Sequence, residues 1–492
     1  MQALARRAGR RVAATGIAAL TSLALLAGCT PSPPATTAPE PQGTRDAGIL
    51  LFQWTWNAIA DECAFLGESG IDWVLASPPQ EHVVRDEWWV HYQPVSYQIE
   101  SRLGTRDEFA AMVATCAEHD VDIVADAVVN HMTGLGTPGV GWAGSEFEHF
   151  RYPGIWEPDD FHQCTESPTG EIIDYRDADE VRNCRLVNLA DLATGTERVR
   201  EGLRNYLDDL LSLGVAGFRI DAAKHMEPAD IAAIVRDLPE GVRVYQEVIR
   251  ASSEPIQPEE YLDNGPSWEF LYARTLKSMV DSGSLNPRVV FGPEGGSVPS
   301  ELAISFVDNH DTERNGETLS YKDGDAYLLG LAFMLAHPYG TPQLSSGYAF
   351  EGRDAAPPLQ ADGRVADASC ADAADAPQPR YEPGEWVCPQ RWTGVTGMLA
   401  FRSAVGDAPL TDDVRFDGER RALSGFGRGE YGYIAFNGGP LDLEGTFDSS
   451  LRAGSYPDVL SGEVVEVDES GAFTAVVPGR SFVALHVGAV ER

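Results

Sequence analysis

Charged side chains stand inside and directly after an apolar segment at residues 214–225, which reads GVAGFRIDAAKH. The first part of this segment has the composition of a buried strand, yet it contains Arg219 and ends at Asp221. Charged side chains are rarely buried unless they are paired, because an unpaired buried charge is costly. The segment therefore indicates either a structural ion pair or a strand that ends in a site that uses charge.

Three further apolar segments also end in polar residues. They read VDIVADAVVNH, VRVYQEV and ELAISFVDNHD, and their polar residues are Asp126, Asn130, His131, Glu247, Asp308, His310 and Asp311. One aspartate at a strand end is often only a cap or turn residue, and one histidine is often only a core residue. Polar residues at the ends of four separate strands favour a shared site, like that at the carboxyl ends of barrel strands.

Two carboxyl groups in different protonation states are what glycoside hydrolysis requires. Arg219 lies two residues before Asp221 and should hold that carboxyl ionised, as a nucleophile requires. Glu247 lies among apolar neighbours on the next strand, which favours the protonated form of a general acid. Carboxyl groups on adjacent strands can lie about 5–5.5 Å apart, the spacing found in retaining enzymes.

An aromatic cluster follows the second apolar strand, in the segment DEWWVHYQPVSY at residues 86–97. It supplies Trp88, Trp89 and Tyr92, and sugar faces pack well on such rings. The alternative is that these rings only pack the loop against the core.

Apolar strands alternate with amphipathic helices from about residue 46. Eight strands are predicted, at 48–56, 71–77, 121–130, 214–221, 242–248, 268–273, 301–311 and 342–348. Repeated strand–helix units favour a parallel sheet, and eight of them favour an α/β fold of the (β/α)8 TIM barrel type. The alternative is an open doubly wound sheet, but no glycine-rich dinucleotide fingerprint follows a strand.

Helices are predicted at 58–67 and 106–118, and a third is predicted to begin with a capping box from Thr194 to Glu197. Residues 132–185 show no clear helical period, which is typical of a functional segment or a small inserted domain. After about residue 398, short apolar segments such as MLAFRS and YGYIAFN are separated by turns, and they predict a C-terminal antiparallel β domain over 398–492.

The first 45 residues are excluded from the fold prediction. Residues 1–29 combine a basic start with an apolar stretch that ends in LAGC, which resembles the lipobox of a bacterial lipoprotein signal peptide and predicts lipidation at Cys29. The alternative is an ordinary secretory signal with a chance cysteine. Residues 30–45 are rich in proline and threonine, as in an extended tether. We expect a secreted protein that is anchored by lipid at a bacterial cell surface.

Six cysteines remain besides Cys29, and an even number in an exported chain predicts disulfides. Six cysteines allow fifteen pairings, so the sequence alone leaves the choice open. The helical faces that carry Cys63 and Cys116 could meet on the sheet, and the other four cysteines could then close two local loops, giving the pairs Cys63–Cys116, Cys164–Cys184 and Cys370–Cys388. No cysteine spacing indicates zinc.

The formal charge of −38 argues against partners that are polyanions. So acidic a chain repels nucleic acid and anionic membrane surfaces, and it suits a neutral or cationic ligand. We expect no nucleic-acid partner, membrane contact only through the lipid anchor, and a monomer.

The segments DAVVNH, GFRIDAAKH, YQEV and FVDNHD together, in this order, resemble the α-amylase family of glycoside hydrolases. WWVHYQPVSY and HPYG are most similar to its animal-type branch, which also occurs in actinobacteria. The resemblance covers residues 46–492. It implies a barrel over 46–131 and 188–397 with a small B domain inserted at 132–187, and the predicted cysteine pairs agree with this branch.

The resemblance also implies a role for each matching residue. Asp221 would be the nucleophile, Glu247 the acid/base, and Asp311 would hold sugar hydroxyls and stabilise the transition state. The same subsite would be lined by Tyr92, His131, Arg219 and His310, and the leaving-group side by Lys224 and His225. A structural calcium ion would be held by Asn130, Asp191 and the backbone carbonyls of Arg182 and His225, since oxygen ligands suit calcium.

One departure from the branch concerns chloride. Many animal-type members hold an activating chloride with three residues, of which Arg219 and Asn309 match, but Gln343 occupies the third position. We therefore do not expect a chloride requirement. The sequence as a whole predicts a calcium-binding α-amylase that cleaves internal α-1,4 bonds of starch- or glycogen-type glucans with retention. The alternatives are an exo-acting or transglycosylating member of the family, or a surface lipoprotein that only binds glucan.

Overall fold

The computed structural model describes residues 38–370 and 381–489. The predicted signal peptide, Cys29 and the first part of the predicted tether lie outside these residues. The described end of that segment runs along a helix of the fold, since the backbone N–H groups of Gln42 and Gly43 donate to the carbonyls of Ala404 and Ser403.

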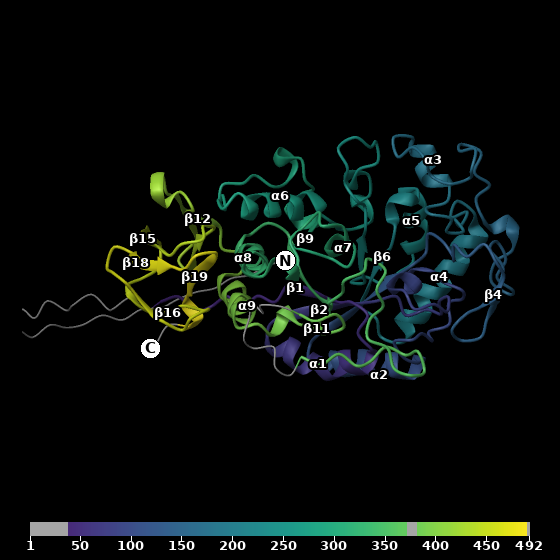
Figure 1. Ribbon diagram of the computed structural model, residues 1–492, viewed down its shortest axis with the longest axis horizontal. Coiled ribbons are helices and arrows are strands. Elements are labelled where there is room, and N and C mark those ends of the chain that lie inside the picture. Colours follow the sequence, from purple (N-terminus) through teal and green to yellow (C-terminus); the bar gives the residue numbers. More distant parts are fainter. Residues whose placement is uncertain (1–37, 371–380, 490–492) are drawn as a thin grey trace, which may run out of the picture. The chain divides into compact units, whose positions relative to one another are not determined.

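A closed barrel of parallel strands forms the centre of the fold (Figure 1). Its strands pair in chain order, and β1 pairs with β10 to close the ring. They are β1 (Ala47–Leu51), β2 (Ile71–Ala76), β3 (Asp122–Ala127), β6 (Gly217–Ile220), β7 (Arg243–Gln246), β8 (Ser267–Trp268), β9 (Ala303–Phe306) and β10 (Thr341–Tyr348). The prediction of a (β/α)8 barrel is confirmed, because closure excludes the open doubly wound sheet.

Helices cover the outside of the barrel (Figure 1). They are α1 (Trp56–Glu68), α2 (Arg106–Ala117), α4 (Glu197–Ser212), α5 (Pro228–Val235), α6 (Phe270–Asp281), α7 (Thr312–Asn315), α8 (Asp325–Ala336) and α9 (Thr393–Val405). Helix α2 begins with the predicted capping box, in which Thr105 and Glu108 bond each other's backbone N–H. The capping box predicted for α4 is wrong: Thr196 alone caps the helix by accepting from the Val199 N–H, while the hydroxyl of Thr194 donates to Asp230.

The segment between β3 and β6 contains little regular structure. It holds β4 (Gly139–Val140), β5 (Glu146–Phe147) and the short helix α3 (Ala178–Asn183). A bridge from His131 to Asp191 joins its two ends, so the segment returns to the barrel close to where it left, and a bridge from Phe161 to Leu192 holds its middle against its last part.

Antiparallel strands follow the barrel, as predicted. β12 (Leu410–Arg415), β13 (Leu423–Arg428), β14 (Gly432–Asn437) and β19 (Ser481–His486) form one sheet, while β15 (Leu443–Asp448) pairs with β18 (Ala472–Val477) and β16 (Gly454–Pro457) with β17 (Val464–Val467). Helix α8 is buried on all sides because it also packs on this sheet, with the Phe333 ring 5.6 Å from that of Phe436.

Two segments predicted as strands are helical. MLAFRS lies inside α9, and only Trp268 of WEFLYA belongs to a strand, since α6 begins at Phe270. Both are short apolar runs, for which periodicity alone does not separate a buried strand from a buried helix.

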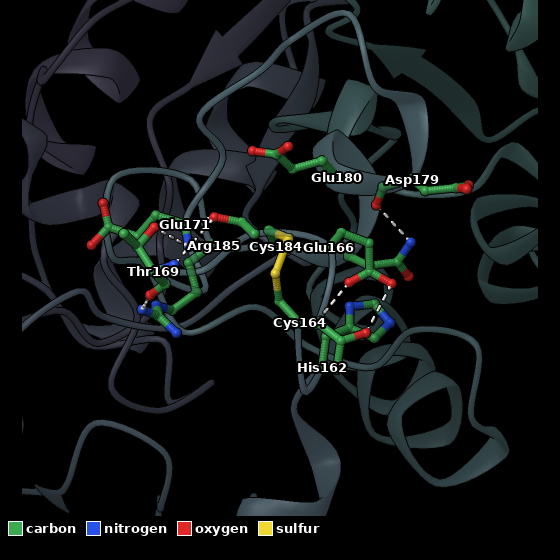
Figure 2. Close-up of a disulfide and its surroundings, with 12 residues drawn as sticks. His162, Cys164, Glu166, Thr169, Glu171, Asp179, Glu180, Cys184 and Arg185 are labelled. Carbon is green, nitrogen blue, oxygen red and sulfur yellow. Dashed lines mark hydrogen bonds between the residues drawn. A yellow bond between two sulfur atoms is a disulfide. The ribbon is translucent and has the colours of Figure 1, made fainter.

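Three disulfides lie in the described residues, so the expectation of disulfides is confirmed. They join Cys63 to Cys116, Cys164 to Cys184 and Cys370 to Cys388. The first links α1 to α2 across a Cα–Cα distance of 5.0 Å. Figure 2 shows the second, which ties α3 to the loop that carries His162. No helix of the described residues has the length and apolar composition needed to cross a membrane.

Candidate active site

The strand register brings the predicted carboxyl groups to one end of the barrel. Asp126 of β3 is the register partner of Arg219 of β6, and Ile220 is the partner of Gln246 of β7. Asp221 and Glu247 each follow directly, and their backbone N–H groups extend the ladder to the preceding strand. The two carboxyl groups therefore lie at the carboxyl ends of adjacent strands, the catalytic end of such barrels.

Arg219 is the centre of the site. Its side chain is 3% exposed, and Nη1 donates to Asp126 Oδ1 at 2.5 Å and to Asp221 Oδ1 at 3.0 Å. Its Nη2 lies 2.6 Å from Glu247 Oε1. The apolar segment at residues 214–225 thus contains a buried cation that three carboxyl groups share.

Burial has a larger effect on the pKa values of Asp126 and Asp221 than the arginine has. It raises the pKa of Asp221 well above its usual range, and Arg219 opposes this shift without reversing it. Burial likewise raises the pKa of Asp126 to about 6. The ionised state of Asp221 stays a prediction, in which Arg219 favours the charged form against the effect of burial. Burial and the arginine thus act in opposite directions on the pKa values of Asp126 and Asp221.

The backbone turns sharply after Asp221. Ala222 has φ 49°, in the left-handed region that residues with a Cβ rarely adopt. This conformation points the Ala222 N–H at Glu247 Oε2, at 3.3 Å. The strained residue therefore links the two acids, and such strain is often found at functional sites.

Aromatic rings form one wall of the site. His310 stacks on Tyr92, with ring centroids 5.0 Å apart, and on Phe52 at 4.8 Å. The edge of Trp88 approaches His310 at 5.7 Å. The hydroxyl of Tyr92 donates to Asp126 at 2.9 Å, so the wall is joined to the carboxyl cluster.

A cleft of about 390 Å³ opens over these groups. It is lined by nine of the predicted residues: Trp88, Tyr92, His131, Asp221, Lys224, His225, Glu247, His310 and Asp311. Arg219 lies beneath the lining, and Trp89 is only partly buried and does not line the cleft.

Several cleft residues have no role predicted from the sequence. They are Tyr175, Leu186, Val187, Leu189, Ala222, Ile249, Ala251 and Glu254. Most come from loops, whose paths the sequence pattern does not give. Asp126 also gained no predicted role, although a charged residue inside an apolar strand was a signal of the same kind as Arg219.

Two predicted residues on the far side of the cleft are held by loop contacts. Lys224 Nζ donates to the Ile249 carbonyl at 2.8 Å and forms an ion pair with Glu254. His225 Nδ1 lies 3.1 Å from the Val181 carbonyl. Both side chains are therefore fixed before any substrate binds.

Two of the residues predicted to bind calcium, Asn130 and Asp191, lie close together where the inserted segment leaves and rejoins the barrel. Asn130 and Asp191 are each about 97% buried or more, and the carboxyl group of Asp191 is hydrogen-bonded to His162 at 2.6 Å. Burial raises the pKa of Asp191 to about 6. The carbonyl of Arg182 lies in the last turn of α3, where helix carbonyls lack intrahelical partners. A buried carboxyl group among amide and carbonyl oxygens fits a hard cation such as calcium.

The position expected to weaken chloride binding is also buried. The Gln343 side chain is 1% exposed and accepts from Trp268 Nε1 at 3.2 Å. The Asn309 side-chain oxygen accepts from the backbone N–H groups of Asp311 and Thr312, at 3.0 and 2.8 Å. The expectation of no chloride requirement stays a prediction.

The chain is similar to known α-amylases. Residues 54–281 match the family model described as the α-amylase catalytic domain. The chain is 42% identical to an α-amylase of Streptomyces violaceus over 95% of this chain and 79% of that protein. It is 40% identical to an α-amylase of Tenebrio molitor over 85% of this chain and 90% of that protein.

Solved structures of α-amylases are also similar to this chain. The structure of α-amylase I from Eisenia fetida superposes with a TM-score of 0.83 at 32% identity, covering 92% of this chain and 98% of that one. A variant of the same enzyme in complex with maltohexaose gives the same TM-score at 33% identity, covering 90% of this chain and 97% of that one. The chain therefore belongs to the α-amylase family of glycoside hydrolases, with relatives in both actinobacteria and animals.

Proposed function

We propose that this enzyme cleaves internal α-1,4 bonds of starch- and glycogen-type glucans with retention of configuration, using Asp221 and Glu247 as its reacting carboxyl groups. The observation that carries the proposal is the shared contact of both groups with Arg219. Carboxyl groups on adjacent strands that meet one guanidinium form a close pair, and close pairs are typical of retaining enzymes.

In the first step, the Asp221 carboxylate attacks the anomeric carbon while Glu247 protonates the departing glycosidic oxygen. Bond breaking leaves a glycosyl ester on Asp221 and a free glucan end. In the second step, Glu247 removes a proton from water, which attacks the same carbon and releases Asp221. The Arg219 donors stabilise the Asp221 carboxylate before attack and again on its release.

The remaining cleft residues bind the glucan. Asp311 is proposed to hold two sugar hydroxyls, because its carboxyl group lines the cleft beside His310. The aromatic wall of the cleft, which includes Trp88 and Tyr92, offers an apolar face to the sugar. Lys224 and His225 are proposed to contact the leaving-group side, and Trp89 to contact the glucan beyond the cleft.

A structural calcium ion is part of the proposal. Asn130, Asp191 and the carbonyls of Arg182 and His225 would hold it, and it would supply a fixed positive charge between the inserted segment and the barrel. Because His225 also lines the cleft, its position there would depend on the ion.

Secretion is proposed from the disulfides, which are typical of oxidising compartments. Anchoring through Cys29 rests on the lipobox-like sequence. Globomycin, which blocks lipoprotein signal peptidase, tests it: anchoring predicts that a precursor accumulates, whereas an ordinary secretory signal predicts unchanged processing.

Incubation with soluble starch tests the function itself, with viscosity and reducing ends followed together. Internal cleavage predicts a steep fall in viscosity at few reducing ends, whereas exo action releases reducing ends at nearly constant viscosity. Glu247→Gln should abolish hydrolysis, and NMR of early products should show the α-anomer. A protein that only bound glucan would change neither signal, and a transglycosylase would build longer oligosaccharides from maltohexaose.

A further inference from the structure

A buried arginine outside the cleft forms no ion pair with a carboxylate in the part of the chain that the structure describes. Arg102 lies in the turn before α2 and is 1% exposed. Among the described residues, no aspartate or glutamate forms an ion pair with it. Burial lowers its pKa to about 10, so the side chain remains a cation at neutral pH. An isolated buried cation is costly. The hydrogen bonds of this guanidinium must therefore offset the cost of burying its charge.

All five N–H donors of Arg102 are used, and four of them reach one loop, residues 85–91. Nη1 donates to the carbonyls of Arg85 and Asp86 at 3.4 and 3.0 Å, and one Nη2 bond reaches the carbonyl of Glu87 at 3.1 Å. The other Nη2 bond goes to Gln53 Oε1, and Nε donates to His91 Nε2, both at 3.1 Å. A planar guanidinium with five fixed donors is suited to holding several carbonyls in one arrangement.

Two buried glutamines complete the attachment. Gln53 Nε2 donates to the carbonyl of Trp88 at 3.0 Å, and Gln80 Nε2 donates to the carbonyl of His91 at 2.8 Å. Gln53 itself is fully buried with φ 61°, a conformation that is rare for a non-glycine residue. The backbone of residues 85–91 is thus held from below by three side chains from other segments.

The loop held in this way carries the aromatic wall of the cleft. Residues 88–92 form a short 3₁₀ helix, and its ends are Trp88 and Tyr92. The segment before it is exposed, and no backbone N–H of the described residues donates to the carbonyls of residues 85 and 86. Local backbone structure alone therefore does not fix where Trp88 and Tyr92 stand.

We infer that Arg102, acting with Gln53, is a positioning residue that places Trp88 and Tyr92 against the sugar. The inference rests on the proposed role of these rings in binding glucan. It separates Arg102 from an ordinary core residue, because loss of its donors should weaken glucan binding in a protein that is still folded.

The chain offers a matched control in Arg428 of β13. This arginine is also 1% exposed, and burial likewise lowers its pKa to about 10. It also donates to backbone carbonyls, those of Ala336, Gly406 and Ala408, at 2.6 to 2.7 Å. None of these lines the cleft, so R428K changes the same chemistry away from the rings.

The test measures the Kd of maltohexaose by calorimetry in a Glu247→Gln background, at a temperature where all variants are folded. R102K should weaken binding by about 10-fold, which corresponds to about 1.4 kcal/mol of binding free energy, because the two rings lose the support that places them against the sugar. R428K should lower the melting temperature similarly but leave the Kd within about twofold. Gln53→Met should weaken binding as R102K does, and it replaces R102K if that variant fails to fold.

A Kd unchanged in R102K or, in its place, Gln53→Met would overturn the inference, and so would an equal loss of affinity in R428K. Failure of the proposed function looks different. In that case Glu247→Gln would still hydrolyse starch, or the wild-type protein would have no activity, whatever Arg102 does to the Kd.

Discussion

Replacing Arg219 with methionine removes the one cation that three buried carboxyl groups share, with little change in side-chain volume. Asp126, Asp221 and Glu247 all contact its guanidinium within 3.0 Å. Removing one partner of a buried ion pair costs about 3–5 kcal/mol, because the other partner keeps its desolvation cost. We expect R219M to lower the free energy of unfolding at pH 7 by about 4 kcal/mol and to abolish hydrolysis.

The loss should also depend on pH, and its sign follows from linkage. Burial already raises the pKa of Asp126 to about 6 with the arginine present, and removing the cation raises it further. A carboxyl group whose pKa is higher in the folded state than in the unfolded state costs more stability as the pH rises. Each extra proton held by the folded variant therefore reduces its deficit by about 1.4 kcal/mol for every pH unit lowered.

Urea unfolding followed by tryptophan fluorescence, at pH 7 and pH 5, measures both effects. The deficit of R219M should shrink by about 1–3 kcal/mol between the two pH values. R106M is the control, because Arg106 pairs with Asp209 where the side chains are 42% and 38% exposed. Such a surface pair is worth about 0–1 kcal/mol. A deficit of R219M that is equal at both pH values, or as small as that of R106M, would refute the shared-cation reasoning.

Three further predictions concern other parts of the chain. Asp191→Asn should abolish the stabilisation by added calcium in calorimetry, which for the wild type is about 2.7 kcal/mol at 100 times the Kd; equal calcium responses would contradict the proposed ligand. Replacing Cys164 and Cys184 with serine should cost about 3 kcal/mol in chemical denaturation, and no loss would show that the loop is held by other contacts. Burial lowers the pKa of His82 to about 3, so the folded state excludes a proton that the unfolded state binds below pH 6.5. Stability is therefore lost as the pH falls from 6.5 to 4, and His82→Gln should reduce this acid slope by up to about 1.4 kcal/mol per pH unit, with an unchanged slope counting against it.

The barrel and the cleft follow from the sequence because the informative residues stand at strand ends. Once eight strands are placed in parallel order, Asp221 and Glu247 must lie at one end of the barrel, and their register needs no further information. The sequence pattern did not predict that MLAFRS is helical. In α9, Met398, Leu399, Phe401 and Val405 are all buried, so the short segment has neither a clear strand period nor a clear helical period.

The environment of the site residues was harder to predict than their positions. The sequence places Arg219 beside Asp221, but it does not show that Asp126 and Glu247 compete for the same guanidinium. The extent to which burial opposes this cation therefore could not be predicted from the sequence. The role of Arg102 was also hidden, because its partners are backbone carbonyls, which leave no trace in residue types.

The number of carboxyl groups around Arg219 affects how many protons the site holds. Three carboxyl groups around one guanidinium have an excess of acid, so in a buried site some of them must hold a proton. A retaining hydrolase needs this mixture, one carboxyl group ionised for attack and another protonated for the leaving group. Asp126 receives a hydrogen bond from Tyr92 as well as from Arg219. We therefore expect Tyr92→Phe to lower kcat and to shift its pH profile while the stacked ring still binds sugar. An unchanged pH profile would mean that Asp126 does not share protons with the reacting pair.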